Sequence, residues 1–392
     1  MKSDVHGYTK KLTNLKERVN SASVDASTRR YLLRFEQHCA LKGISIARRE
    51  KCLSTLLQVY KFLGKPLAKA NKRDIIKFIE HLQQSSLSEW TKRDYKVILK
   101  IFYRFIRGME GSGRYPPEVE WIPTREPNGR ALPSDQLLTP EEVQALAQSA
   151  HNARDRAAVL VLYESGCRVG EFLSLRIRDV RIDEYGAVLM VDGKTGRRRV
   201  RVIASASALA NWLIVHPYKD NPDAPLWVAL ASNFKGKALN YRGFCEMLKE
   251  LARRAKIRKR VNPHSFRHAR ATHLANKLTE AQMKELFGWT QSSDMASIYV
   301  HLSGRDVDNA LLEIHGLSPP SKSEEKFRLK VCPRCQEKNS PDAVYCARCA
   351  LPLDVRTTAW EDRVLNELLK RPQVNRILKK ALMEMARKAE ML

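Results

Sequence analysis

Histidine and arginine side chains gather in the segment NPHSFRHARATHLA, which spans residues 262–275. An Asn followed by a Pro is typical of a helix start, so the segment is predicted to be helical from Pro263. His264 and Arg267 then lie one turn apart. An imidazole moves protons near neutral pH, and a guanidinium is a permanently charged fork that fits oxyanions. The pair indicates a site for a phosphate, whereas His264 alone would be explained by a structural role.

Three further places in the chain carry groups of this kind. Arg168 and Glu171 lie three residues apart in SGCRVGEFLSLR, Lys194 lies in the turn DGKTGR, and Trp289 precedes Tyr299 by ten residues. Each has an ordinary explanation: an i,i+3 ion pair, a solvated turn lysine and two core aromatics. The order and spacing of the whole set are what indicate a common site.

The set resembles the boxes of the tyrosine recombinases, also called the phage integrase family. The first arginine box of that family is similar to SGCRVGEFLSLR, and its H-x-x-R box is similar to HSFRH. Its third box is similar to FGW, and its nucleophile box to YVH, all in the family's order. The resemblance covers about residues 20–316. The interval from Trp289 to Tyr299 is one residue longer than the commonest bacterial pattern, and the residues around it are similar to archaeal integrases.

The resemblance implies a site-specific DNA recombinase that forms a 3′-phosphotyrosine, without ATP or a catalytic metal. Each residue of the set then takes a role that suits its chemistry. The implied catalytic roles are as follows: Tyr299 is the nucleophile, Arg168 and Arg267 bind the non-bridging oxygens, His264 relays the tyrosine proton, Lys194 protonates the leaving oxygen, Trp289 positions the phosphate, and Glu171 orients Arg168 or His264. The alternatives are a chromosome or plasmid dimer-resolving recombinase, a type IB topoisomerase-like enzyme and a non-catalytic DNA-binding protein.

The net charge favours a polyanionic partner. The chain has 70 Lys and Arg against 43 Asp and Glu, a formal charge of +27. Such an excess favours nucleic acid, and an RNA-bound ribosomal factor is the competing interpretation. The resemblance narrows the partner to double-stranded DNA, bound by a tetramer on two duplexes, and leaves accessory DNA-bending proteins open. The sequence has no apolar run of membrane-spanning length and no secretory signal, so a cytoplasmic protein without membrane contact is expected.

These residues lie on segments that are predicted to be mainly helical, with a small antiparallel β hairpin formed by GAVLMV and RRVRVI around the turn DGKTGR. Pro- and Gly-rich stretches mark the boundaries between domains. The predicted domains are a helical core-binding (SAM-like) DNA-binding domain at 1–122, a linker at 123–138, the tyrosine recombinase catalytic domain at 139–316, a linker at 317–330, a zinc ribbon at 331–353 and a helical tail at 354–392.

The first predicted domain contains four amphipathic helices, each bounded by capping residues or glycines. The last of them carries basic and aromatic side chains together, a combination that suits a phosphate backbone but is also common on a solvated helix face. Lys92, Arg93 and Lys96 on that helix are the predicted DNA contacts.

The cysteines fall into two groups. Four are scattered, and the other four form the pattern C-x2-C-x10-C-x2-C at Cys332, Cys335, Cys346 and Cys349. Two such knuckles are typical of a structural Zn²⁺ site, and two disulfides or a redox pair are the alternative. The tail that follows carries an apolar stripe at helical spacing, which predicts that it either covers the ribbon or docks on a neighbouring protomer.

Overall fold

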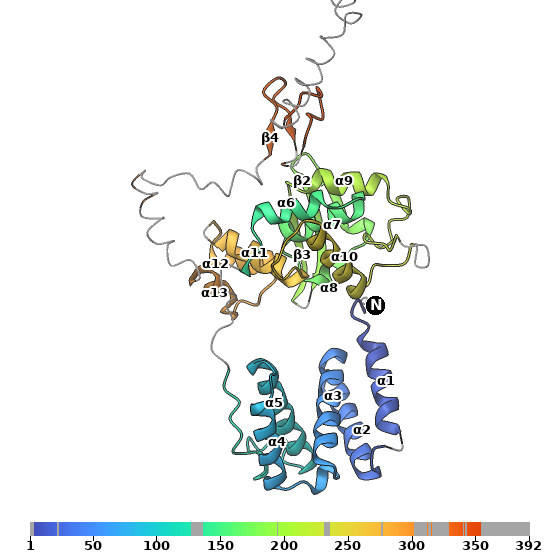
Figure 1. Cartoon of the computed structure of the whole chain (residues 1–392), viewed down its shortest axis with the longest axis vertical. Coiled ribbons are helices and arrows are strands. Elements are labelled where there is room, and N and C mark those ends of the chain that lie inside the picture. Colours follow the sequence, from blue (N-terminus) through green and yellow to red (C-terminus); the bar gives the residue numbers. More distant parts are fainter. Residues whose placement is uncertain are drawn as a thin grey trace, which may run out of the picture. The chain divides into compact units, whose positions relative to one another are not determined.

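The computed structural model describes residues 4–21, 23–126, 136–193, 195–230, 236–275, 277–301, 312, 315, 329–339, 341 and 343–353. The chain divides into two compact units, Met1–Leu132 and Pro133–Leu392, and the division falls within the predicted linker at 123–138. The described part is mainly helical, with one three-stranded and one two-stranded antiparallel sheet (Figure 1). Among the described residues, no helix is long and apolar enough to cross a membrane.

The first unit is a helical bundle. Its five α-helices are α1 (Tyr8–Asn20), α2 (Ala26–Leu41), α3 (Ile46–Leu63), α4 (Lys72–Gln84) and α5 (Glu89–Ile106). The predicted caps are present, since Asn71 and Ser88 accept hydrogen bonds from the first turns of α4 and α5. The core contains Phe35, whose ring packs edge-on against Phe102 with 5.4 Å between centroids. Helix α1 adds to the four helices predicted from the sequence.

The second unit begins with helices α6 (Pro140–Gln148), α7 (Ala153–Ser165) and α8 (Val169–Leu173). A three-stranded antiparallel sheet follows, formed in order by β1 (Val180–Asp183), β2 (Gly186–Gly193) and β3 (Gly196–Val202). The predicted hairpin is confirmed, because β2 pairs with β3 from Ala187↔Val202 to Gly193↔Gly196. Strand β1 was not predicted. Its exposed central residues give it no apolar pattern.

Five further helices follow among the described residues of the second unit. They are α9 (Ala206–Ile214), α10 (Tyr241–Arg254), α11 (Pro263–Ala275), α12 (Glu280–Phe287) and α13 (Met295–His301). The start of α11 is as predicted, because the Asn262 side chain accepts hydrogen bonds from the His264 and Ser265 amides. Helix α11 packs against α7, α12 and α13, so segments distant in the sequence meet around it.

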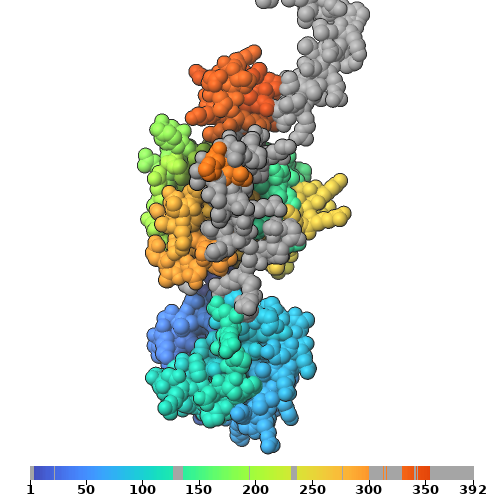
Figure 2. All heavy atoms as spheres, turned by 90° about the vertical axis from the view of Figure 1, so that its left-hand side faces the viewer, coloured from blue at the N-terminus to red at the C-terminus, as the bar shows by residue number. Residues whose placement is uncertain are grey.

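The cysteine-rich segment has a two-stranded sheet of its own, β4 (Lys330–Val331) with β5 (Lys338–Asn339). In the space-filling view its described residues, in orange, gather in one small rounded body (Figure 2). The predicted helical tail at 354–392 lies outside the described residues.

Candidate active site

Arg168 follows a sharp turn between two helices. Helix α7 ends at Gly166, whose φ of 58° lies in the left-handed region. A Cβ atom at Gly166 would lie 2.4 Å from Phe287 Cε1, so this position requires glycine. Arg168 then caps α8, and its Nη2 donates a 2.9 Å hydrogen bond to the Gly288 carbonyl. Its side chain is 33% exposed, which leaves the guanidinium within reach of a ligand.

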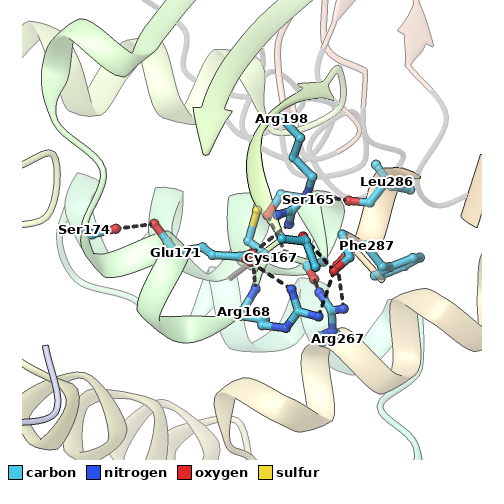
Figure 3. Close-up of polar contacts among 12 residues, drawn as sticks. Ser165, Cys167, Arg168, Glu171, Ser174, Arg198, Arg267, Leu286 and Phe287 are labelled. Carbon is cyan, nitrogen blue, oxygen red and sulfur yellow. Dashed lines mark hydrogen bonds and ion pairs between the residues drawn. The ribbon is translucent and has the colours of Figure 1, made fainter. Parts of the chain in front are cut away.

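Glu171 is the buried carboxylate of the site. Its Oε1 lies 3.0 Å from Arg168 Nη1, and its Oε2 lies 2.7 Å from Arg198 Nη2 (Figure 3). Burial would raise the pKa of this carboxyl, but hydrogen bonds from Arg198 and Arg168 outweigh burial and hold the pKa below its usual value. The predicted contact between Glu171 and Arg168 is present. Glu171 is therefore ionised and holds two arginines.

Arg267 lies on α11 and is buried beside Arg168. Its Nη1 donates to the Gly166 carbonyl at 2.8 Å and its Nη2 to the Phe287 carbonyl at 2.7 Å (Figure 3). Burial, together with the charge of Arg168, lowers the pKa of Arg267 to about 10. It is still protonated at neutral pH. We call Arg168 and Arg267 the arginine pair: their Nη2 atoms are held by the carbonyls of consecutive residues, Gly288 and Phe287.

Tyr299 on α13 lies at one side of this pair. Its ring is stacked on Trp289 at 5.6 Å between centroids and 7° between planes, and Trp289 is stacked in turn on Phe287. The guanidinium of Arg267 lies 5.5 Å from the Trp289 ring centroid. Tyr299 is 4% exposed, and burial raises the pKa of its hydroxyl to about 12. The phenol is therefore neutral near pH 7 and needs a base to become a nucleophile.

The histidine that meets the Tyr299 hydroxyl is His268. Its Nδ1 forms a short hydrogen bond with Tyr299 Oη, whereas His264 is exposed at the start of α11. The rings of the two histidines are 6.5 Å apart. His264 was predicted to relay the tyrosine proton, whereas the imidazole that is hydrogen-bonded to Tyr299 in the structure is that of His268. Burial, then the neighbouring His264 and Arg267, lower the pKa of His268, so its imidazole is neutral at pH 7.

Lys194, the predicted general acid, lies outside the described residues. Its two chain neighbours are at the site. A Cβ atom at Gly193 would lie 2.4 Å from Glu171 Oε1, and Thr195 Oγ1 donates a 3.2 Å hydrogen bond to the Gly288 carbonyl. The end of the β2–β3 hairpin therefore contacts Glu171 and Gly288, the same groups that bind Arg168.

Known proteins match this chain over the region that holds the site. The profile of the Phage integrase family matches residues 136–305. Tyrosine recombinase XerC of Roseiflexus sp. (strain RS-1) is 30% identical in an alignment of 247 residues that covers 59% of this chain and 74% of the relative. This chain belongs to the phage integrase family. It is a tyrosine site-specific recombinase. Tyrosine recombinase XerD of Bifidobacterium longum (strain NCC 2705) is also similar, with 27% identity over 62% of this chain and 82% of the relative.

Solved structures have the same fold as this recombinase. The XerH site-specific recombinase bound to its difH substrate before cleavage is 20% identical, with a TM-score of 0.53 over 80% of this chain and 96% of that chain. A lambda integrase dimer bound to a core site gives a TM-score of 0.54 at 18% identity, over 74% of this chain and 82% of that one. These likenesses bear on the fold, whereas the archaeal resemblance around Tyr299 stays a prediction.

The predicted DNA contacts of the recombinase lie on α5, where the structure gives Lys92 and Arg93 partners within the chain. Lys92 is buried, and its Nζ lies 2.9 Å from both the Gln83 carbonyl and Glu89 Oε1. Lys96 is also buried. Arg93 is partly exposed, and its Nη2 lies 3.3 Å from Glu126 Oε1. Of the three, Arg93 offers the most accessible cation, and DNA contact by any of them stays a prediction.

The four clustered cysteines of the recombinase converge on one point. Their sulfur atoms all lie within 4.8 Å of one another. The sulfurs of Cys332 and Cys349 are 3.5 Å apart, as are those of Cys335 and Cys346, and all four are free thiols. These separations are far longer than a disulfide bond of about 2 Å. The cluster offers four sulfur ligands to a single metal ion.

Proposed function

We propose that this recombinase cleaves and rejoins DNA through a 3′-phosphotyrosine formed by Tyr299. The observation that carries the proposal is the arginine pair. Carbonyls of consecutive residues hold its two guanidinium groups side by side, next to the Trp289–Tyr299 stack. Two neighbouring positive charges are stabilised by an anion between them, and two planar forks fit the non-bridging oxygens of one phosphate. They also stabilise the extra charge that develops on phosphorus as the tyrosine attacks.

His268 is proposed as the base that activates Tyr299, a role that the resemblance alone gave to His264. As Tyr299 Oη bonds to phosphorus, its proton passes to Nδ1 of the neutral imidazole, which already shares a hydrogen bond with it. The bond from phosphorus to the 5′-oxygen breaks, and that oxygen takes a proton, in this proposal from Lys194. The products are a 3′-phosphotyrosine and a free 5′-hydroxyl. Attack by another 5′-hydroxyl reverses the step, so joining requires no ATP.

The other residues of the set support the phosphate in this proposal. His264 stands one turn before His268, is exposed, and donates a hydrogen bond to the bound phosphate. Trp289 packs between Phe287 and Tyr299 and positions the nucleophile by stacking. Glu171 orients Arg168 through their 3.0 Å ion pair.

The cysteine cluster is proposed to hold a structural Zn²⁺. Four cysteine sulfurs that converge within 4.8 Å match the preferred ligand set of that ion. The surrounding polar groups fit thiolates, because Asn339 Nδ2 lies 3.6 Å from Cys346 Sγ and the Asn339 side chain is buried. In this proposal the four cysteine thiolates would hold the ion, and this would stabilise the segment 331–353 without a role in cleavage.

The assembly is proposed on the pattern of the structural neighbours, which include a lambda integrase tetramer bound to a Holliday junction. Residues 1–122 would act as the core-binding domain and 139–316 as the catalytic domain, with 123–138 and 317–330 as linkers. The tail at 354–392 would join protomers within a tetramer on two duplexes. Element integration and dimer resolution use the same chemistry and remain alternative settings, and accessory DNA-bending proteins remain open.

A nicked suicide substrate tests the proposed function, because loss of a short 5′ fragment traps the covalent intermediate. We expect the wild-type chain to form an adduct with duplex DNA, and Tyr299→Phe to lower its rate by at least about 10⁴-fold while duplex affinity is retained. The reason is that only the phenolic oxygen is removed. An adduct formed by the Phe variant would reject Tyr299 as the nucleophile and direct attention to Tyr185 or Tyr241.

A further inference from the structure

A third arginine, Arg198, enters the site from strand β3. Its side chain points to the buried face of the sheet with those of Val200 and Val202, and it is 10% exposed. Nε donates a 3.0 Å hydrogen bond to the Leu286 carbonyl, and Nη2 lies 2.7 Å from Glu171 Oε2 (Figure 3). Its Nη1 is buried and meets no hydrogen-bond acceptor in the described part of the chain. The site therefore contains a buried cation that the proposed chemistry does not use.

Two glycines make room for this guanidinium. A Cβ atom at Gly288 would lie 2.7 Å from Arg198 Nη1, and one at Gly193 would lie 3.2 Å from the same atom. The Gly193 Cβ would also lie 2.4 Å from Glu171 Oε1. Gly193 ends β2, and Gly288 directly precedes Trp289. Arg198 thus fills the space between the hairpin and the turn at residues 286–289.

Arg198 also alters the charge balance around Arg168. Glu171 carries one negative charge and faces two arginines, with Oε1 on Arg168 and Oε2 on Arg198. If Glu171 faced Arg168 alone, the two opposite charges would cancel. With Arg198 present the three side chains keep one net positive charge, so the carboxylate orients Arg168 without neutralising it. The accessible guanidinium of the three is that of Arg168, and a phosphate would meet the remaining charge there.

We infer that Arg198 is a positioning residue for the arginine pair. It holds the carboxylate that orients Arg168, and it holds the 286–289 turn, whose carbonyls bind both members of the pair. A lysine at this position would keep the charge but lacks the planar fork that bonds Glu171 and the Leu286 carbonyl together. This inference rests on the proposed function, because the arginine pair is positioned to bind the scissile phosphate.

The test measures the single-turnover rate of adduct formation on the suicide substrate at saturating full-length protein. We expect Arg198→Met to lower the rate by about 10–100-fold and Arg198→Lys to lower it less. The matched control is Arg197→Met on the same strand, whose side chain is 65% exposed, and it should stay within about 2-fold of wild type. Thermal unfolding is followed in parallel. If Arg198→Met does not fold, Arg198→Lys carries the comparison.

Two readouts separate positioning from a merely structural role. A methylphosphonate at the scissile position has no negative charge, so it depends less on cations, and the loss caused by Arg198→Met should shrink to a few-fold on it. In a Glu171→Gln background the same substitution should cost much less than in wild type, because both act through Arg168. Equal loss on both substrates, or additive losses, would overturn the inference. So would a wild-type rate in Arg198→Met. Absence of adduct from wild type would instead overturn the proposed function.

Discussion

The arginine pair and the cysteine cluster each bring chemically identical side chains close together, but different parts of the chain hold them in place. The pair is held by carbonyls and a carboxylate from two stretches that are far apart in the sequence: the α7–α8 region, and the end of α12 with the turn after it. The cysteines all come from residues 332–349 of one short segment. The pair is therefore a product of the folded core, whereas the cluster, in our proposal, would rely on a bound ion to hold its own segment together. Substitutions in the arginine pair should therefore lower the rate of DNA cleavage, and substitutions in the cysteine cluster should disturb local folding.

Between these two regions, the largest expected effect comes from breaking the arginine pair itself. Arg267→Ala should lower the rate of adduct formation by about 10²–10³-fold, because one preorganised cation is lost from the phosphate. It should also lower the free energy of unfolding by about 1–3 kcal/mol, since the Gly166 and Phe287 carbonyls lose their donor. Single-turnover kinetics and thermal unfolding measure the two losses. A variant with the wild-type rate would show that the pair does not contact the reacting phosphate.

The base next to the pair is tested by pH. Because the pKa of His268 lies below its ordinary value of 6.5, its imidazole stays neutral through neutral pH and is protonated only at more acid pH. The adduct rate should therefore be level near pH 7 and fall on acidification below 6.5, as the acceptor is lost. His268→Gln should lower the rate by about 10²-fold and remove this acid limb.

His264→Gln is the matched control for that prediction, since it lies on the same helix one turn away. It should keep the acid limb of the pH profile even if the rate falls. Loss of the limb in His264→Gln, with retention in His268→Gln, would return the proton relay to His264.

Loss of the cysteine cluster should leave the rate of DNA cleavage nearly unchanged. Removal of the metal by a chelator, or Cys346→Ser, should expose the segment 331–353 to protease while the adduct rate stays within about 3-fold of wild type. Limited proteolysis and zinc stoichiometry measure the first effect. A chain that ends at residue 330 should likewise form adducts but assemble two DNA sites poorly. Loss of cleavage on chelation would mean that the two regions are not independent.

The smallest effect is expected from α5, where Lys92 and Arg93 already have partners. Lys92→Met removes a buried ammonium from Gln83 and Glu89, so it should lower the stability of the protein. It should change the slope of log affinity against log salt concentration by less than about 0.9, the value for one phosphate contact. Arg93→Met, at a partly exposed side chain, is the comparison and should change the slope more. A larger slope change for Lys92 would mean that DNA binding displaces its partners.

Much of the site could be predicted from the sequence, because its chemistry allows only a few residue types at each position. Arg168, Arg267, Trp289 and Tyr299 were predicted from the order of their motifs, and the structure brings them together. HSFRH places two histidines one turn apart, and the one that meets Tyr299 depends on how α13 packs against α11, which is a tertiary contact. Arg198 had a signal that was missed. Period-two alternation places it on the same face as the buried Val200 and Val202.

The fold was predicted where apolar patterns are strong. The β2–β3 hairpin and the start of α11 after Asn262 follow from alternation and from cap residues. Helix α1 was missed although Leu12, Leu15 and Val19 give it a buried stripe, because charged and polar residues outnumber them in that segment. The burial of Lys92 could not be read from a basic helix face, since the neighbouring acceptor comes from the end of α4.

The stack of Tyr299 on Trp289 gives this enzyme an internal optical reporter. The Trp289 ring centroid lies 5.6 Å from the centroid of the phenol and 5.5 Å from the Arg267 guanidinium, so we expect the indole emission to respond to both groups. When a phosphate binds, the electric field of the Arg267 guanidinium at the indole should change. When Tyr299 moves away to bond phosphorus, the indole should lose its stacked neighbour. With the remaining tryptophans replaced by Phe, stopped-flow fluorescence of Trp289 would time the departure of the tyrosine separately from the chemical step.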